Sequence, residues 1–332
     1  MSLLLSDFWL IFVIDVGILA LAAVGLYVCF IAGQYSLGHA GLLGAGAYAA
    51  GYVATETGYP FWVGIGFGIL VGALLGLAIG SILRRLREFY LAIGTLALNL
   101  AFIVLLNNTP SLGGALGMFG IRLRTTANMT ILALIAVSVG VVWLERTRLG
   151  RAMRAMHDDE TMAAANGVRI LRVKLVVWTI SGAITGLAGG LQAHFLGIAR
   201  PVDYGMALST ELWVPLFVGG THIVLGPVVG TFLVGLVPEI INRQIQIDPI
   251  MIAGVLLIII MLVRPNGLIQ RGTIRGIRST VKRMRPYNLR RSPVDTVEPT
   301  ATTPPDVEVA QAAPTDDRKI PHESSVPADL EQ

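Results

Sequence analysis

Charged residues are scarce in this sequence, and lysine is nearly absent. Charged side chains make up 14% of its 332 residues, against about 25% in typical soluble domains. Its three lysines are Lys174, Lys282 and Lys319, and none follows a glycine. The chain therefore lacks the Gly-x-x-x-x-Gly-Lys-[Ser/Thr] loop that holds nucleotide phosphates. We expect it to hydrolyse no ATP by that route and to hold no cofactor of its own.

Residues that build metal sites and nucleophilic centres are also few. Cys29 is the single cysteine, which excludes a disulfide framework within the chain. The five histidines are scattered and no Gly-x-Ser-x-Gly motif occurs, so we predict neither a metal site nor an enzyme. The apolar segments also lack an obvious buried acid–base pair of the kind that proton-coupled carriers use, which disfavours a secondary carrier.

Apolar residues dominate instead, with a hydrophobic fraction of 54% and a mean hydropathy of +0.70. Runs of about 20 apolar residues are long enough to cross a bilayer. The sequence therefore predicts an all-α, polytopic transmembrane helical bundle over residues 1–270, with about eight to ten spans and nine favoured. Glycine and proline interrupt 36–54 and 207–230, so either segment is alternatively re-entrant. The candidate spans are 8–32, 36–54, 61–83, 89–107, 128–144, 173–197, 207–221, 224–241 and 250–264.

The basic residues predict the orientation of this bundle. Nine spans place the loops at 84–88 and 145–172 and the segment after residue 264 on one side of the membrane. That side holds 21 of the chain's 25 basic residues, and the other side holds Arg122, Arg124, Arg200 and Arg243. By the positive-inside rule the basic side is cytoplasmic, so the N-terminus lies outside and the C-terminus inside. We attribute the sequence pI of about 9.4 to these charges and not to nucleic-acid binding.

Glycines recur at every fourth position in two of the spans. Residues four apart share one face of a helix, and small residues on that face let two helices approach closely. We interpret these stripes as helix-packing surfaces of a dense bundle, with a groove for a ligand as the alternative. The glycines are Gly64, Gly68, Gly72, Gly76 and Gly80 in one span and Gly182, Gly186 and Gly190 in another.

Two segments, one near each end of the membrane region, combine polar residues with glycine or proline. A pair of interrupted apolar segments often marks a transport pathway, because unwound backbone is tolerated in a membrane only where protein or water surrounds it. For His39, a satisfied hydrogen bond near the membrane surface explains the residue equally well. The candidate residues of the translocation path are Gln34, Ser36, His39, Asn99, Thr210 and Glu211.

Residues 145–174 form a charged segment between long apolar runs. They contain seven basic residues, an acidic step at 158–160, and Gly167 after a run of small residues. Acidic residues favour a helix N-terminus and glycine favours a helix end, so we predict a short helix between them. A helix-forming loop of this length predicts a docking site for another protein. An exposed loop that only sets topology is the alternative.

The composition changes after residue 270. Basic residues at three- and four-residue spacing over 271–291 predict a juxtamembrane segment that contacts anionic lipid at the inner leaflet. Residues 292–332 are rich in proline, threonine, alanine and acids, with almost no aromatic residues. We therefore predict a disordered cytoplasmic tail there.

Six segments, spread in order from about residue 30 to 270, carry a family resemblance. They are SLGHAGLLGAGAY (36–48), FYLAIGTLALN (89–99), LGRAMRAMHDDE (149–160), KLVVWTISGAITGLAGGLQAH (174–194), GGTHIVLGPVVG (219–230) and VRPNGLI (263–269). Together they resemble the LivM-type permeases, the membrane subunits of branched-chain amino-acid ABC importers. The resemblance implies a multi-pass protein of the bacterial cytoplasmic (inner) membrane. It also implies three kinds of partner: a LivH-type permease, two cytoplasmic ABC ATPases and an extracytoplasmic substrate-binding protein.

The resemblance gives the loop 145–172 a role. In ABC importers a short cytoplasmic coupling helix of the permease lies in a cleft of the ATPase and often carries Glu-Ala-Ala-x-x-x-Gly. Here Thr161, Met162 and Ala163 stand at the first three positions before Gly167, with Glu160 one place early, so the motif departs from the family pattern. The predicted ATPase-coupling residues are Asp158, Asp159, Glu160, Ala163, Ala164 and Gly167.

By this resemblance the chain supplies the path and the coupling for leucine, isoleucine and valine, while partner ATPases hydrolyse ATP. Urea or short amides are an alternative substrate class, because related permeases share these motifs. Two alternatives come from other classes: a secondary carrier that needs no partner, and a structural membrane protein without any flux.

Overall fold

The computed structural model of the protein describes residues 2–86, 88–245, 249–264 and 267–268. The chain divides into two units, Met1–Met284 and Arg285–Gln332, and all described residues lie in the first unit. The predicted basic segment 271–291 and tail 292–332 lie outside the described residues, so both stay predictions.

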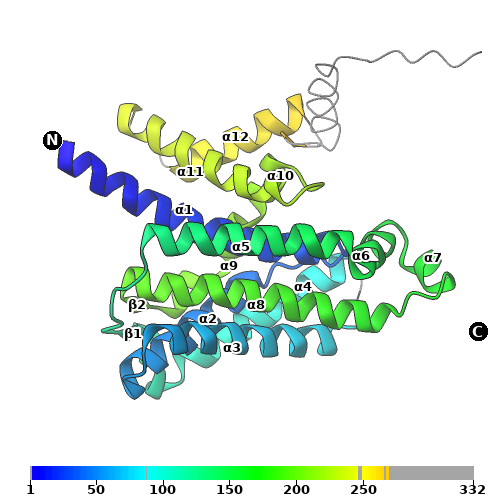
Figure 1. Cartoon of the computed structure of the whole chain (residues 1–332), viewed down its shortest axis with the longest axis horizontal. Coiled ribbons are helices and arrows are strands. Elements are labelled where there is room, and N and C mark those ends of the chain that lie inside the picture. The colour runs from blue at the N-terminus through cyan, green and yellow to red at the C-terminus, as the bar shows by residue number, and fades with distance from the viewer. Residues whose placement is uncertain (1, 87, 246–248, 265–266, 269–332) are drawn as a thin grey trace, which may run out of the picture. The chain divides into compact units, whose positions relative to one another are not determined.

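Helices make up most of the described part of the first unit (Figure 1), which confirms the predicted all-α, polytopic bundle. Six helices contain a segment long and apolar enough to cross a membrane. They are α1 (Ser2–Phe30), α3 (Phe61–Ile82), α4 (Glu88–Asn107), α5 (Ala127–Arg146), α8 (Ile170–Leu196) and α11 (Leu225–Ile245).

The other three predicted spans are shorter or broken. The 14 residues of α2 (His39–Tyr52) extend about 21 Å at 1.5 Å per residue, and the chain then passes into a π-helix, η1 (Val53–Thr57). The segment 207–221 forms two helices, α9 (Met206–Glu211) and α10 (Trp213–Gly219), and the last span is α12 (Pro249–Val263). The described residues thus contain six full-length apolar helices, whereas the sequence favoured nine spans. Both segments that glycine and proline were expected to interrupt are among the shorter three.

The remaining elements are short and lie in the connections between these helices. They are η2 (Pro110–Leu112), η3 (Gly114–Leu116), β1 (Met118–Phe119), α6 (Arg148–Asp158), α7 (Glu160–Ala165), β2 (Ile198–Ala199) and η4 (Pro201–Tyr204).

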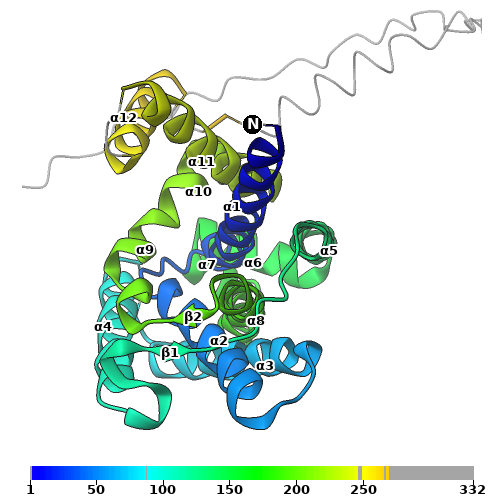
Figure 2. The ribbon, with the colours of Figure 1, turned by 90° about the vertical axis from the view of Figure 1, so that its left-hand side faces the viewer.

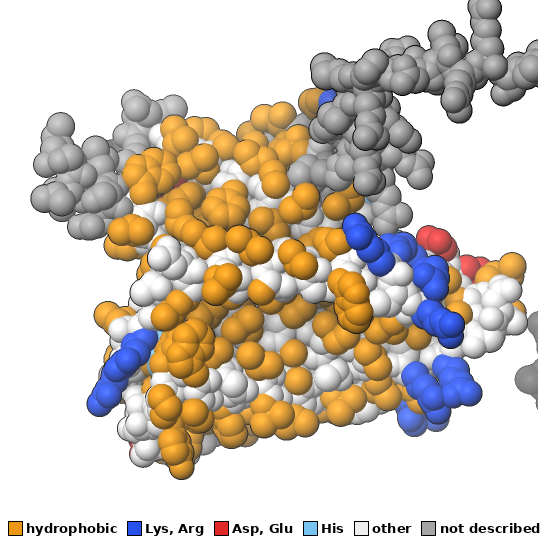
Figure 3. Space-filling view, in the orientation of Figure 1, with side chains coloured by type: hydrophobic (Ala, Val, Ile, Leu, Met, Phe, Trp, Pro, Cys, Tyr) orange, Lys and Arg blue, Asp and Glu red, His pale blue; other side chains and the backbone are white. Residues whose placement is uncertain are grey.

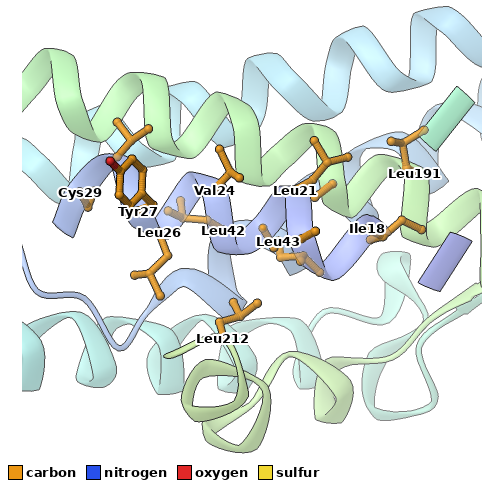
Figure 4. Packing of buried hydrophobic residues seen from close by; sticks show 14 of the residues in the cluster. Ile18, Leu21, Val24, Leu26, Tyr27, Cys29, Leu42, Leu43, Leu191 and Leu212 are labelled. Carbon is orange, nitrogen blue, oxygen red and sulfur yellow. The ribbon is translucent and has the colours of Figure 1, made fainter. Parts of the chain in front are cut away.

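Helix α8 lies at the centre of the bundle and packs against α1, α2 and α3 (Figure 2). Residues 20–29 of α1 are all buried, which explains why that helix is apolar on every side. Figure 4 shows how side chains from three helices meet in this core. The labelled residues include Ile18, Leu21 and Val24 of α1, Leu42 and Leu43 of α2, and Leu191 of α8.

The glycine stripes of α3 and α8 face each other. A Cβ atom added at Gly72 would meet the carbonyl oxygen of Gly182 and would lie 2.8 Å from the Cα of Gly186. A Cβ at Gly186 would lie 3.0 Å from the Cα of Gly72. The two backbones therefore touch directly, and side chains larger than hydrogen at these positions would hold them apart.

The other predicted glycines surround this contact. A Cβ atom added at Gly64 would meet Ala50 and His194, one at Gly68 would meet Gly46 and Gly186, and one at Gly76 would meet Trp178 and Gly182. One at Gly80 would meet the Trp178 ring. In α8, a Cβ atom added at Gly182 would meet Gly72 and Gly76, and one at Gly190 would meet Ile65 and Ala50. All eight glycines thus lie where another helix approaches closely.

Contacts between loops show which helix ends lie together. The ammonium of Lys174, at the start of α8, lies 3.0 Å from Glu160 Oε1 and donates to the carbonyl of Arg84, after α3, at 3.4 Å. The His157 ring in α6 hydrogen-bonds to the carbonyl of Phe30, at the end of α1, at 3.0 Å. These connections therefore lie at one end of the bundle, which we call the basic end (Figure 3).

The opposite end holds the connections between α4 and α5 and between α8 and α9. It is fastened by β1, which pairs antiparallel with β2. Arg122, Arg124 and Arg200 lie at this end, whereas the side chain of Arg243 is not among those described. Lysine and arginine gather at the basic end in Figure 3, near α6 and α7. This asymmetry is the one that the positive-inside rule requires if the basic end is cytoplasmic.

We expect Gly72→Ala to destabilise the bundle, because one methyl group at this position meets the backbone of α8. Overpacking of this kind typically costs about 1–3 kcal/mol. The variant should give less folded protein and a lower Tm in detergent than the wild type. The matched control is Gly66→Ala in the same helix, where an added Cβ meets nothing within 4 Å. Equal melting temperatures for the two variants would contradict the packing interpretation.

Candidate functional site

The helices α6 and α7 form a charged arm (residues 147–169) that projects from the basic end beyond α5 and α8 (Figure 1). The acidic step within it is divided between the two helices. Asp158 is the last residue of α6 and is exposed. The carboxylate of Asp159 caps α7 by accepting from the amides of Thr161 at 2.7 Å and Met162 at 2.9 Å. Such a cap satisfies N–H groups that have no partner inside the helix.

The other end of α7 is closed by Gly167. Its φ is +82°, a left-handed conformation that favours glycine. Its amide donates to the carbonyl of Ala164 at 3.0 Å, and the amide of Val168 donates to that of Ala163 at 3.1 Å. A helix of only six residues is therefore fixed at both ends by its own sequence.

The sides of α7 differ in what they contact. Glu160 makes an ion pair with Lys174, whose side chain is only 2% exposed, and Ala163 is buried within the chain. Glu160 therefore fastens α7 to α8, and Ala163 is small because it packs inside its own protein. The surface that α7 presents outward consists instead of Thr161, Met162, Ala164 and Ala165.

Helix α6 joins the arm to the bundle. The guanidinium of Arg154 lies 3.1 Å from the carboxylate of Glu145 at the end of α5, and the Tyr27 hydroxyl of α1 donates to the same carboxylate at 2.7 Å. Two residues of α6 itself, Met153 and Met156, are buried. The arm thus has polar contacts with α1, α5 and α8 and an apolar contact with the core.

An aromatic cluster lies where α6 meets the loop after α1. The Phe30 ring makes edge-to-face or tilted contacts with Tyr35, His157, Trp213 and Phe217, with ring centroids 5.5–6.3 Å away. The indole of Trp213, in α10, donates to the carbonyl of Ser36 at 3.0 Å. A movement of α6 would therefore displace both the loop 31–38 and the broken helix α9–α10.

Three buried polar residues continue this connection into the bundle. The Ser181 hydroxyl of α8 donates to the carbonyl of Gly25 in α1 at 2.7 Å. Because its one proton is used there, Ser181 accepts from His39 Nε2 at 2.7 Å. The other ring nitrogen, Nδ1, then accepts from the Ser36 hydroxyl at 2.9 Å. His39 is thus a fully satisfied, buried residue that links α1, α2 and α8.

Gln34 and Asn99 are buried as well, at different places. Gln34 lines a cavity of about 340 Å³ beside the arm, together with Tyr35 and His157. The amide of Asn99, in α4, donates to the Tyr204 carbonyl at 3.3 Å and to the Ser209 hydroxyl at 3.4 Å. Asn99 therefore fastens the short elements before α10.

Thr210 and Glu211 are exposed in α9, whereas the other four candidates are buried. The Thr210 hydroxyl donates to the carbonyl of Met206 at 2.9 Å. Glu211 borders a small cavity of about 50 Å³ together with Val16 and Leu19 of α1. Asp15, which precedes Val16 in α1, is also exposed. The six predicted path residues thus separate into a buried group and an exposed pair.

Sequence reasoning missed four residues that the structure brings into these sites. Ser181, Trp213, Lys174 and Asp15 each place a polar or ionisable group within an apolar segment. That property is the signal that would have found them, since such groups in membrane helices are rarely without a partner or function. Their partners come from distant parts of the chain, which the sequence does not show.

Known proteins resemble the chain over most of these elements. A family model described as "Branched-chain amino acid transport system / permease component" matches residues 9–264. The high-affinity branched-chain amino acid transport system permease protein LivM of Escherichia coli (strain K12) is 28% identical over 274 residues, which cover 72% of this chain and 64% of LivM. The chain thus spans less than two thirds of that relative's length.

Two further relatives show how wide the similarity is. The permease protein LivH of the Escherichia coli (strain K12) branched-chain amino acid system is 25% identical over 150 residues, 45% of this chain and 47% of LivH. The ribose import permease protein RbsC of the same strain is 25% identical over 242 residues, 69% of this chain and 74% of RbsC. No solved structure matches the chain.

The family model covers the chain from Trp9 in α1 through the end of α12. It therefore includes the central helix α8, the broken helix α9–α10 and the whole charged arm. The protein belongs to the family of permease components of branched-chain amino acid transport systems.

Proposed function

We propose that the chain is a permease subunit of an ABC importer for branched-chain amino acids and that its charged arm couples the transport path to separate ATPase subunits. The observation on which this proposal rests is the construction of the arm. It is a short helix, capped at both ends, that projects from the basic end of an otherwise apolar bundle (Figure 1). A loop that only sets topology needs no such defined shape.

The outward surface of α7 suits a protein partner. Met162 is 62% exposed and lies between small residues, so a cleft on another protein can approach the helix backbone closely. Methionine adapts its shape to a partner surface. The caps at Asp159 and Gly167 fix the helix in advance, which lowers the entropy lost on docking. We therefore assign the ATPase contact to this surface and assign Glu160 and Ala163 to holding it in place.

Motion of the arm has a physical route to the transport path. Its first step is the hydrogen bond between His157 and the carbonyl of Phe30, and its second is the aromatic cluster around Phe30. Trp213 then links the cluster to α10 and to Ser36, whose hydroxyl contacts His39. A shift of α6 would thus displace the start of α2 and the break between α9 and α10.

The path itself is best placed on the surface that carries Asp15 and Glu211. Both carboxylates are exposed, and Asp15 lies inside the apolar span Phe8–Phe30. A charged side chain facing lipid at the centre of a helix costs about 2.5–3.5 kcal/mol. This surface therefore faces water or protein. We place the second, LivH-type permease opposite it, with the path between the two subunits.

The substrate class follows from the relatives and not from the geometry. LivM and LivH are named as branched-chain amino acid permeases, whereas RbsC, which is less similar to the chain than LivM, is named as a ribose permease. Leucine, isoleucine and valine are thus the first candidates, delivered by an extracytoplasmic binding protein to a multi-pass complex in the bacterial inner membrane. Urea or short amides remain the alternative substrate class, and an enzymatic activity of this chain is not part of the proposal.

Uptake of labelled leucine into proteoliposomes tests the proposal. The vesicles hold this chain with its co-purified partners and binding protein, with or without internal ATP. We expect uptake only with ATP, reduced by excess isoleucine or valine and unaffected by urea. Uptake in vesicles without any ATPase would instead indicate a secondary carrier. ATP hydrolysis without leucine uptake would retain the ABC class and exclude the substrate.

We expect Glu160→Lys to uncouple ATP hydrolysis from transport, because it replaces the ion pair with Lys174 by a repulsion and frees α7 from α8. Uptake per ATP hydrolysed should fall at least about tenfold, which corresponds to a lost coupling free energy of about 1.4 kcal/mol. Membrane insertion and yield should stay near those of the wild type.

The control for this variant is the charge exchange Glu160→Lys with Lys174→Glu. It restores an ion pair of reversed sign, so coupling should recover at least in part. Unchanged uptake per ATP in the single variant would show that the ion pair has no role in coupling.

A further inference from the structure

Four arginines gather where the end of α3 meets the start of α8. Arg84 and Arg85 follow α3, whereas Arg169 precedes α8 and Arg172 lies in its first turn. All four side chains are exposed. We call these four residues the arginine patch, and basic side chains lie at these helix ends in Figure 3.

The glycine contact between α3 and α8 fixes the position of the patch. The two helices run antiparallel, and their contacts advance by one helical turn at a time. The successive pairs are Gly72 with Gly186, Gly76 with Gly182, and Gly80 with Trp178. One turn further, the Lys174 ammonium donates to the Arg84 carbonyl at 3.4 Å. The packed backbones therefore hold the connection after α3 beside the first turn of α8.

The patch lies at the surface of the membrane. Ile82 ends one apolar span and Phe89 begins the next, so the connection 83–88 is too short to carry its arginines far from the bilayer. Ile82, Phe89 and Tyr90 are 65%, 72% and 74% exposed. Exposed aromatic rings at the end of a span are typical of the boundary between lipid and water. The guanidinium groups thus lie at the level of the lipid headgroups.

The charges of the patch are not balanced within the described chain. Among the described residues, none of its four guanidinium groups forms an ion pair with a carboxylate, whereas Arg154 pairs with Glu145 at 3.1 Å. Glu160 of the arm is engaged by Lys174 at 3.0 Å. Grouped like charges repel one another, and positive charge is disfavoured at the start of a helix. An anion bound at the patch would relieve both effects.

The surroundings of the patch favour a lipid as the source of this anion. Guanidinium groups bind the oxygens of a phosphate in pairs, and the phosphates of the bilayer lie at this depth. Leu74, Leu77 and Ile82 of α3 are exposed below the patch, and they offer an apolar surface to acyl chains. The outward surface of α7, to which we assign the ATPase, lies instead on the arm that projects beyond the bundle (Figure 1).

We propose that Arg84, Arg85, Arg169 and Arg172 bind the phosphate of an anionic phospholipid in the cytoplasmic leaflet. The bound lipid fastens the connection between α3 and α4 to the start of α8, from which the charged arm extends. This site is separate from the predicted basic segment 271–291. It is also independent of the substrate that the transporter carries.

Photolabelling of the assembled transporter tests the proposal. Phosphatidylcholine nanodiscs contain a trace of photoactivatable phosphatidylglycerol, and mass spectrometry measures the labelling of the peptide that holds Phe89 and Tyr90. In the wild type, unlabelled phosphatidylglycerol should reduce this labelling at a concentration at least about tenfold below that of added phosphatidylcholine. In Arg84→Gln with Arg85→Gln, and in Arg169→Gln with Arg172→Gln, this preference should fall to about twofold or less.

Two further variants serve as controls. Arg84→Lys with Arg85→Lys keeps the charge and should retain most of the preference. Arg148→Gln with Arg151→Gln removes two exposed arginines of α6 from the same end of the bundle, outside the patch, and should behave as the wild type does. The segment 271–291 is the same in every variant, so it cannot account for a difference between them.

Three results would overturn the proposal. One is an undiminished preference for phosphatidylglycerol in both glutamine variants of the patch. Another is loss of the labelling when inorganic phosphate is added, which would assign the patch to a soluble anion. The third is labelling that appears only after the ATPase subunits are removed, which would assign the patch to the protein interface. Failure of the proposed function is separate, since it appears as absent ATP-driven leucine uptake by the wild type.

Discussion

Direct contact between the backbones of α3 and α8 is the constraint on which the rest of the bundle depends. Apolar side chains gain little by leaving lipid for a protein interior, so helices in a membrane are held by dispersion and weak hydrogen bonds at short range. Gly72, Gly182 and Gly186 permit that range because they have no side chains. The same contact brings the end of α3 to the start of α8, where Arg84 and Lys174 meet.

Helix α8 connects the two ends of the bundle. Its 27 residues extend about 40 Å, more than the hydrocarbon core of a bilayer. At one end Lys174 holds the charged arm through Glu160, and at the other His194 and Gly197 hold the loop that carries Arg122 and Arg124. Between them, Ser181 joins α8 to α1 through the carbonyl of Gly25 and to α2 through His39. One rigid element thus contacts the proposed ATPase coupling arm, the core and the loop before α5.

Local chemistry made part of this structure predictable. The long spans followed from apolar runs, the grouping of loops at the basic end from arginine counts, and the end of α7 from Gly167. The family resemblance on which the proposed function rests was also predictable from short sequence segments. Contacts between distant residues were not: no sequence pattern shows that Glu160 faces Lys174, that Ala163 points inward, or that Trp213 reaches Ser36. Those depend on how α8 and α10 lie against their neighbours.

The central claim is that the outward surface of α7, at the basic end of the bundle, contacts an ATPase subunit. Cysteine cross-linking tests this claim most directly. The single native cysteine, Cys29, is buried, so the wild type provides a silent background. In the assembled complex, Met162→Cys and Ala164→Cys should cross-link to the ATPase, and the yield should change when ATP is added. Ala163→Cys, on the buried side, should not cross-link. Absence of any product at the two exposed positions, or an equal yield at all three, would contradict the account.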